Sequence, residues 1–205
     1  KYYRRATRGT NLVLVEPELF RFLERCVGYS QQSEGAFDIT VGPLMKAWGF
    51  FRGEGRIPWS FELWNVLRKV GYQHLRLDST QRMVQFARSG MELDLGGIAK
   101  GYAVDRVVEL LKAQRIERGF VSAGGSTLYG LGAPPDSLGW EVKLQDPLAP
   151  HDRQKSAATV LLKNQCLSVS GSYEKFFKVR GVTYSHIMDP HTGRPVENML
   201  SVAVI

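Results

Sequence analysis

A glycine-rich stretch at residues 93–105 has the residue types that bind phosphate. Asp94 ends a predicted strand, Gly96 and Gly97 make a tight turn, and a helix follows at once. The free backbone N–H groups and the positive end of the helix dipole favour an anion at such a turn. The glycines let the backbone approach a ligand closely, and Lys100 adds a mobile positive charge. Asp94 could accept a ligand hydroxyl or amide, or help to hold a metal. The pattern also fits an ordinary turn with Asp94 as cap and Lys100 in solvent.

Residues 35–44 could bind a flat heteroaromatic ring. Their glycines and Pro43 predict an irregular backbone after a first helix. Phe37 offers a flat face for stacking, and Asp38 and Thr40 could bond to the edge of the ring. The alternative is a loop with Phe37 in the core.

Residues 184–195 contain a histidine in a position typical of catalytic side chains. His186 ends a predicted strand and is followed by a turn rich in proline and glycine. Histidine can transfer protons near neutral pH, although a histidine beside a turn can also be structural. His191 lies inside the turn, and we expect it to face solvent. Two further strands end in small residues, at 122–126 and 168–173, which could line a ligand cleft or make tight turns.

Three helices and several short strands must position these residues. Pro17 after Glu16 predicts the start of a first helix, and Ser60 caps a second that ends at Gly71. The third helix carries apolar residues on one face from Val104 to Leu111. Alternating apolar residues between 75 and 95 predict a three-stranded meander. Later strands are predicted at 120–121, 140–144, 159–162, 166–169, 176–179 and 201–205. Helices mixed with antiparallel meanders indicate an α+β fold.

Composition narrows the class of protein. A length of 205 residues with 43% apolar side chains supports a packed core in a single domain spanning 1–205. The net charge of +7 is spread along the chain, with a modest cluster at the start formed by Lys1, Arg4, Arg5 and Arg8. Without a recognition motif, this charge does not predict nucleic-acid binding. Cys26 and Cys166 lack a Cys-x-x-Cys spacing, so we expect small buried apolar residues and not a zinc site.

Neither membrane insertion nor secretion is visible in the chain itself. The sequence has no run of about 18 apolar residues, and no signal peptide opens it. Lys1 follows no initiator methionine, and the apolar run at the end stops without a turn. We therefore expect a chain trimmed at both ends.

Four motifs occur in the order found in the FAD:protein FMN transferase family, known as ApbE-like, which this sequence resembles. They lie at residues 35–38, 94–101, 170–173 and 186–193, and the similarity runs from about Glu16 to Ile205. The resemblance implies a single α+β unit made of two related T-fold-like halves with antiparallel sheets and packed helices, and FAD in a cleft between them.

The resemblance also implies roles for particular residues. The flavin contacts fall on Ala36, Phe37, Asp38, Asp94, Lys100 and Ile187. The backbone carbonyl of Gly97 is one magnesium ligand, and His186 matches the histidine implicated in activity, here a general base. The family's further Mg²⁺ ligands, an Asp and a Ser or Thr, would lie beyond Ile205, and another flavin contact comes from a region before this chain.

The implied reaction moves FMN from FAD to a Ser or Thr hydroxyl of a partner flavoprotein and releases AMP. If water attacks instead, the same site is an FAD pyrophosphatase that yields FMN and AMP. The runner-up is an FAD-binding protein without turnover. Family members also suggest a place in the bacterial cell envelope, in the periplasm or on the outer face of the inner membrane, with the full-length protein lipid-anchored.

Overall fold

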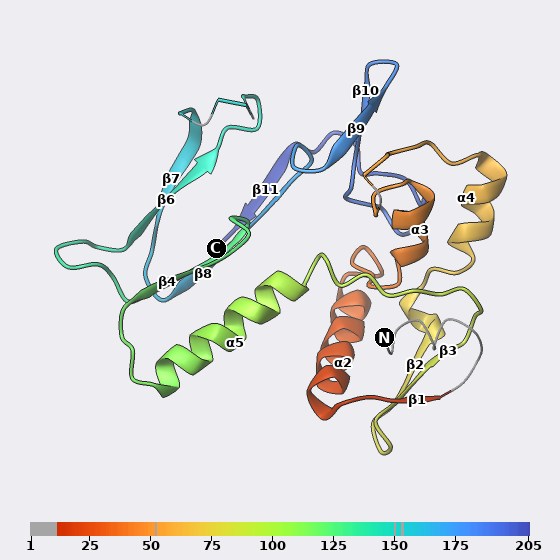
Figure 1. Ribbon diagram of the computed structural model, residues 1–205, viewed down its shortest axis with the longest axis horizontal. Coiled ribbons are helices and arrows are strands. Elements are labelled where there is room, and N and C mark those ends of the chain that lie inside the picture. The colour runs from red at the N-terminus through yellow and green to blue at the C-terminus, as the bar shows by residue number, and fades with distance from the viewer. Residues whose placement is uncertain (1–11, 52, 150, 153) are drawn as a thin grey trace. The chain divides into compact units, whose positions relative to one another are not determined.

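The computed structural model describes residues 12–51, 53–149, 151–152 and 154–205 (Figure 1). The basic cluster predicted at Lys1, Arg4, Arg5 and Arg8 lies outside them. The chain forms two compact units. Unit 1 contains the residues up to Leu95 together with Lys175–Glu197, and unit 2 contains Gly96–Glu174 together with Asn198–Ile205.

Helix α2 (Pro17–Gln32) opens unit 1 and confirms the first predicted helix. Pro17 stands at the start of the helix, where its missing N–H would have no intrahelical partner. The buried face carries Phe20, Leu23 and Cys26. The helix ends in a left-handed turn, because the Gly35 N–H donates to the carbonyl of Ser30 at 2.7 Å with φ of +87° at Gly35.

Two shorter helices follow, and they differ from the predicted pattern. Helix α3 (Gly42–Ala47) forms where an irregular backbone was expected. Helix α4 (Ser60–Leu67) ends before the predicted stop at Gly71, and a 3₁₀ turn at Tyr72–His74 follows. Helices α3 and α4 contact each other (Figure 1).

The strands of unit 1 form a three-stranded sheet and a hairpin, all antiparallel. The sheet has the order β1 (Val13–Leu14), β3 (Met83–Phe86), β2 (Leu75–Asp78), and the hairpin pairs β9 (Phe176–Val179) with β10 (Val182–Ser185). The prediction of a third meander strand up to Leu95 was wrong. Strand β1 pairs with the edge of β3 that this strand would have used, and residues 91–95 instead run beside the loop before α3.

The turn that follows β10 packs into the hydrophobic core formed by α3 and α4. Leu44, Trp48, Leu63, Val70 and Met188 are buried together. The indole N–H of Trp48 donates to the carbonyl of Gly193 at 2.8 Å, which ties helix α3 to this turn. Gly193 has φ of +68°, and a Cβ there would lie within 3.0 Å of leucine side chains from α3 and α4. The turn therefore packs closely only because this residue is glycine.

Unit 2 places helix α5 (Ala99–Ala113) in contact with strands β4 (Gly119–Ala123) and β5 (Thr127–Leu131). These strands belong to a four-stranded antiparallel sheet of order β11-β8-β5-β4, with β8 at Gln165–Gly171 and β11 at Ser201–Val204. Strands β6 (Trp140–Gln145) and β7 (Ser156–Leu162) form a separate antiparallel pair. Leu128, Leu162 and Leu167 are buried in the core. The mixed α+β fold with several antiparallel sheets is confirmed.

The two cysteines behave largely as expected. Cys26 is fully buried, and burial raises the pKa of its thiol to about 11. Cys166 is half-buried, and both cysteines are free. No helix among the described residues is long and apolar enough to cross a bilayer.

Candidate functional site

In unit 1, the start of the motif at 94–101 lies beside the loop that carries the motif at 35–38. The Asp94 N–H donates to the carbonyl of Ile39 at 2.7 Å, and Glu92 forms a parallel bridge with Val41. A Cβ on Gly42 would lie 2.8 Å from the Glu92 carbonyl oxygen, so glycine permits this approach. Asp94 is half-buried at the end of the extended segment. The structure therefore brings Asp94 next to the loop that carries Ala36, Phe37 and Asp38.

Asp38 organises that loop with its buried carboxylate. Oδ1 accepts hydrogen bonds from the backbone N–H and the hydroxyl of Thr40, both at 2.7 Å, and Oδ2 accepts the Tyr72 N–H at 2.7 Å. The Thr40 hydroxyl oxygen in turn accepts the N–H of Gly71 at 2.7 Å. A carboxylate has about four acceptor sites, so three are used to hold the fold. About one acceptor position therefore remains for the predicted bond to the edge of a ring.

Ala36 and Phe37 are more accessible than Asp38. Ala36 is exposed, and Phe37 is half-buried with its N–H donating to the Ser33 hydroxyl at 3.0 Å. Phe37 is therefore not a core residue, as the alternative prediction had it. The loop presents an aromatic side chain from a backbone that Ser33 and Asp38 hold in place.

His186 follows strand β10 directly, as predicted. Its backbone N–H donates to the carbonyl of Lys175 at 3.0 Å, and its Nδ1 lies 3.1 Å from the same oxygen. Because a carbonyl only accepts, Nδ1 carries the hydrogen, and the basic lone pair of the neutral ring is on Nε2. This tautomer suits a general base acting through Nε2. The neighbouring Ile187 is half-buried, and its carbonyl accepts the Val196 N–H at 2.8 Å.

The turn after His186 is built around Asp189. Its Oδ1 accepts the backbone N–H of His191 at 2.9 Å, and its Oδ2 accepts the Thr192 hydroxyl at 2.7 Å. Burial acts to raise the pKa of this carboxyl, but the hydrogen bonds and the nearby imidazole of His191 outweigh it and hold the pKa below its usual value. Asp189 is therefore ionised at neutral pH.

His191 is exposed, as predicted, but it also makes a long-range contact. Its side chain is 61% exposed, while Nε2 lies 3.0 Å from the carbonyl oxygen of Glu34. No local pattern in the sequence predicts this contact, because the two residues are 157 positions apart.

In unit 2, Gly97 and Lys100 lie at the start of helix α5. Gly97 is exposed in the turn before the helix, and Ile98, not Asp94, occupies the capping position. The predicted alternative of Asp94 as cap was therefore wrong.

The ammonium of Lys100 donates to the hydroxyl of Ser126, so Lys100 is not simply in solvent. Ser126 is buried and follows two glycines of positive φ, Gly124 and Gly125. In the sequence, only the stretch of small residues at 122–126 pointed to Ser126.

The remaining motif, at residues 170–173, closes the end of strand β8. The N–H and the hydroxyl of Ser172 donate to the carbonyl of Leu200 at 2.9 and 3.1 Å. A Cβ on Gly171 would lie 2.6 Å from the Tyr173 ring, so the glycine lets this ring fold back.

The described residues do not by themselves fit a complete magnesium site. Mg²⁺ usually takes six oxygen ligands, including one or two carboxylates. Within residues 12–205, the described part contains no group of three or more His, Cys, Asp or Glu residues that could hold a metal ion. The exposed turn at Gly97 could offer one backbone carbonyl.

Ser185, next to His186, is a position where a substitution should raise the stability of the protein. It is buried, and among the described residues its hydroxyl has no hydrogen-bond partner. Ser185→Ala removes this unpaired group, so we expect the free energy of unfolding in urea to rise by about 1 kcal/mol.

Thr40→Val is the matched control, since the Thr40 hydroxyl is buried and bonded to Asp38 and Gly71. That change should lower stability by about 1–2 kcal/mol. A loss of stability in Ser185→Ala would contradict the assignment of an unsatisfied hydroxyl.

The chain is similar in sequence to proteins that share one name. A protein from Treponema pallidum named FAD:protein FMN transferase is 34% identical over 203 residues, covering 93% of this chain and 55% of that protein. The protein of that name from Escherichia coli K12 is 36% identical over 180 residues, covering 85% of this chain and 50% of its own. The chain spans about half the length of these relatives.

Solved structures give the same assignment. The ApbE protein of Thermotoga maritima superposes with a TM-score of 0.90 at 31% identity, covering 99% of this chain and 65% of that one. The flavin transferase ApbE from Vibrio cholerae gives a TM-score of 0.80 at 28% identity, covering 99% and 64%. The proteins matched in sequence and structure are thus flavin transferases and their relatives. Residues 3–205 match the ApbE family, and the chain belongs to that family.

Proposed function

We propose that this protein transfers FMN from FAD to a Ser or Thr hydroxyl of an acceptor flavoprotein and releases AMP. One observation carries the proposal beyond family membership: unit 1 joins the motifs at 35–38 and 186–193 with Asp94, the first residue of the motif at 94–101. The Asp94 segment bonds to Ile39, and the turn after His186 bonds through His191 to Glu34, just before Ala36. Residues predicted to contact flavin from separate parts of the sequence are thereby neighbours in the fold.

The proposed reaction exchanges a phosphoanhydride bond for a phosphoester bond. The acceptor oxygen attacks the phosphorus of the FMN half, and a new O–P bond forms. The bond from this phosphorus to the bridging oxygen of the pyrophosphate breaks, and AMP leaves with that oxygen. The hydroxyl proton passes to Nε2 of His186, which the Nδ1–H bond to Lys175 orients.

The other residues bind and orient FAD in this proposal. Phe37 supplies the aromatic face, with Ala36, Asp38, Asp94 and Ile187 around the flavin. Lys100 and the first turn of α5 stabilise the negative charge that develops as AMP departs. The family resemblance also implies two T-fold-like halves with FAD in a cleft between them, and this arrangement is part of the same proposal.

Magnesium dependence and the cell-envelope location also belong to the proposal, because the family resemblance implies both. The carbonyl of Gly97 would be one metal ligand. Bound Mg²⁺ would neutralise pyrophosphate charge. The roles given to His186 and Lys100 do not depend on where the metal lies.

The test is incubation of the protein with FAD and Mg²⁺, with and without a flavoprotein that carries a target Ser or Thr. We expect AMP release together with covalent flavin on the acceptor, and loss of both when EDTA removes the metal. AMP and free FMN without acceptor labelling would indicate a pyrophosphatase. FAD binding without AMP release would indicate a binding protein without turnover and would contradict the proposal.

A further inference from the structure

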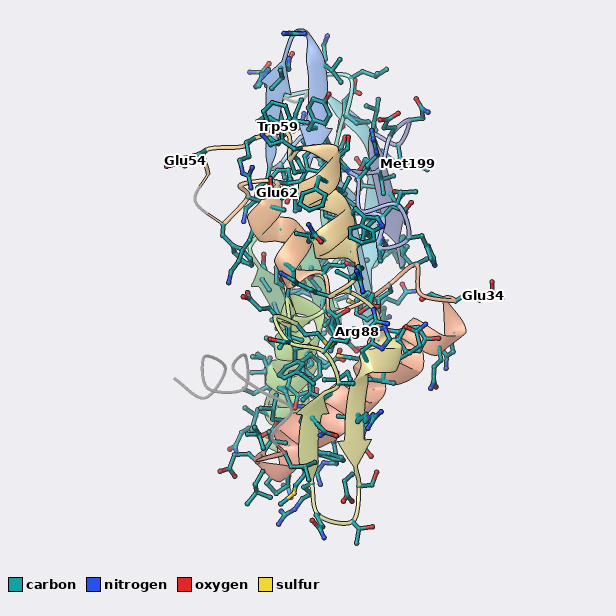
Figure 2. The ribbon with its side chains drawn as sticks, turned by 90° about the vertical axis from the view of Figure 1, so that its right-hand side faces the viewer. Glu34, Glu54, Trp59, Glu62, Arg88 and Met199 are labelled. Carbon is teal, nitrogen blue, oxygen red and sulfur yellow. The ribbon has the colours of Figure 1, made fainter. Side chains whose placement is uncertain are left out.

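His191 connects two segments that the proposed function places around the flavin. Its Nε2 lies 3.0 Å from the carbonyl oxygen of Glu34, at the start of the loop that leaves helix α2. Figure 2 shows the side chain of Glu34 pointing away from the protein, so the contact uses its backbone carbonyl. Because a carbonyl only accepts, Nε2–H of His191 is the donor.

The loop on the Glu34 side needs support because its backbone is left-handed at two successive residues. Glu34 has φ of +53° and Gly35 of +87°. A non-glycine residue in this region costs about 1 kcal/mol or more. A Cβ on Gly35 would lie 3.3 Å from Nε2 of His191, tighter than most contacts. The glycine therefore allows the imidazole to approach the loop, one residue before Ala36.

The turn on the His191 side is rigid enough to serve as an anchor. Asp189 accepts the His191 N–H and the Thr192 hydroxyl through its carboxylate, and the Gly193 N–H at 2.8 Å through its carbonyl. The carbonyl of Gly193 is held in turn by the Trp48 indole in the core. Nδ1 of His191 lies 3.4 Å from Asp189 Oδ1, so the ring stands between this carboxylate and the Glu34 carbonyl.

We infer that His191 is a positioning residue: it fixes the loop bearing Ala36 and Phe37 against the turn that follows His186, and so sets the affinity for FAD. The inference rests on the proposed function. Loss of the bond frees the loop, and FAD binding must then order it again, which weakens affinity. His191 itself transfers no proton in the reaction.

Three substitutions separate this role from a general structural one. His191→Gln keeps an N–H donor at a reach similar to Nε2. His191→Asn places its amide near the Nδ1 position, toward Asp189, and cannot reach Glu34. His191→Leu removes both polar contacts. We expect Leu and Asn to raise the FAD dissociation constant and KM by about 3- to 10-fold, the scale of one hydrogen bond, with kcat within about twofold of the parent. Gln should stay near the parent.

The measurements are FAD titration by calorimetry, AMP-release kinetics and thermal melting of each variant. Unchanged FAD affinity in His191→Leu would overturn the inference. So would Asn behaving like Gln, because the contact with Asp189 alone would then suffice. A parent that binds FAD but releases no AMP would refute the proposed function, while the calorimetric series would still decide the role of His191. A parent that binds no FAD would refute both.

Discussion

Replacing His186 with alanine should lower the rate of FMN transfer at saturating FAD by ~100-fold or more, the usual scale for loss of a general base. The FAD dissociation constant should stay near the parent value, because the ring is assigned to the acceptor hydroxyl and not to the flavin. The Nδ1–H bond to the Lys175 carbonyl holds the imidazole in the tautomer whose Nε2 accepts a proton. Transfer rates under saturating FAD and Mg²⁺, together with calorimetric FAD titration, measure the two quantities separately.

His151→Ala is the control for this change. His151 is exposed in the loop between β6 and β7, and its removal should leave the rate near that of the parent. His191 is unsuitable as a control because of its contact with Glu34. If His186→Ala transfers FMN at the parent rate, the acceptor hydroxyl is activated by another group. If it raises the FAD dissociation constant and keeps the saturated rate, His186 only orients the flavin.

Replacing Lys100 with methionine should weaken FAD binding by about 10- to 100-fold, which corresponds to loss of a charge-assisted hydrogen bond. FMN binding should weaken much less, because FMN lacks the pyrophosphate that Lys100 and the start of α5 are proposed to recognise. The long apolar stem of methionine keeps the packing of the lysine chain. Calorimetric titration of the parent and of Lys100→Met with FAD and with FMN gives the comparison.

Lys112→Met is the matched control, since Lys112 lies on the same helix and its ammonium is near the ring and hydroxyl of the half-buried Tyr129. It should leave both affinities unchanged. Ser126→Ala should give a smaller loss than Lys100→Met, because it removes only the partner that orients the ammonium. Equal losses of FAD and FMN affinity in Lys100→Met would contradict recognition of the pyrophosphate.

The elements with strong local signals were predictable from the sequence. Helix α2 has a proline at its start and a regular apolar face, and α5 has a similar apolar stripe. Helix α3 has neither signal: it has six residues and begins with Gly42 and Pro43. It forms because Leu44 and Trp48 are buried against α4 and the Gly193 turn, and these contacts are made only in the folded chain.

The site was predictable as a set of motifs but not as a set of contacts. Family resemblance marked Asp38 as a flavin contact, and the structure adds bonds from its carboxylate to Thr40 and Tyr72 that the sequence did not indicate. An acidic residue in a loop has the same appearance in sequence for either role. The bonds of His191 to Glu34 and of Lys100 to Ser126 join residues far apart in the chain, and no local periodicity reports such pairs.

The discontinuity of unit 1 affects the order in which the protein can fold during synthesis. The Trp48 indole and its acceptor at Gly193 are 145 residues apart, and the core around Trp48 also needs Met188. At about 5–20 residues per second, a ribosome takes on the order of ten seconds to make that interval. During this time the apolar faces of α3 and α4 lack the cover that Met188 and the turn at Gly193 provide, while all of α5 and most of the unit 2 sheet have already been synthesised. The nascent chain is therefore exposed to aggregation or chaperone capture at α3 and α4, and this exposure ends only after Gly193 has left the ribosome.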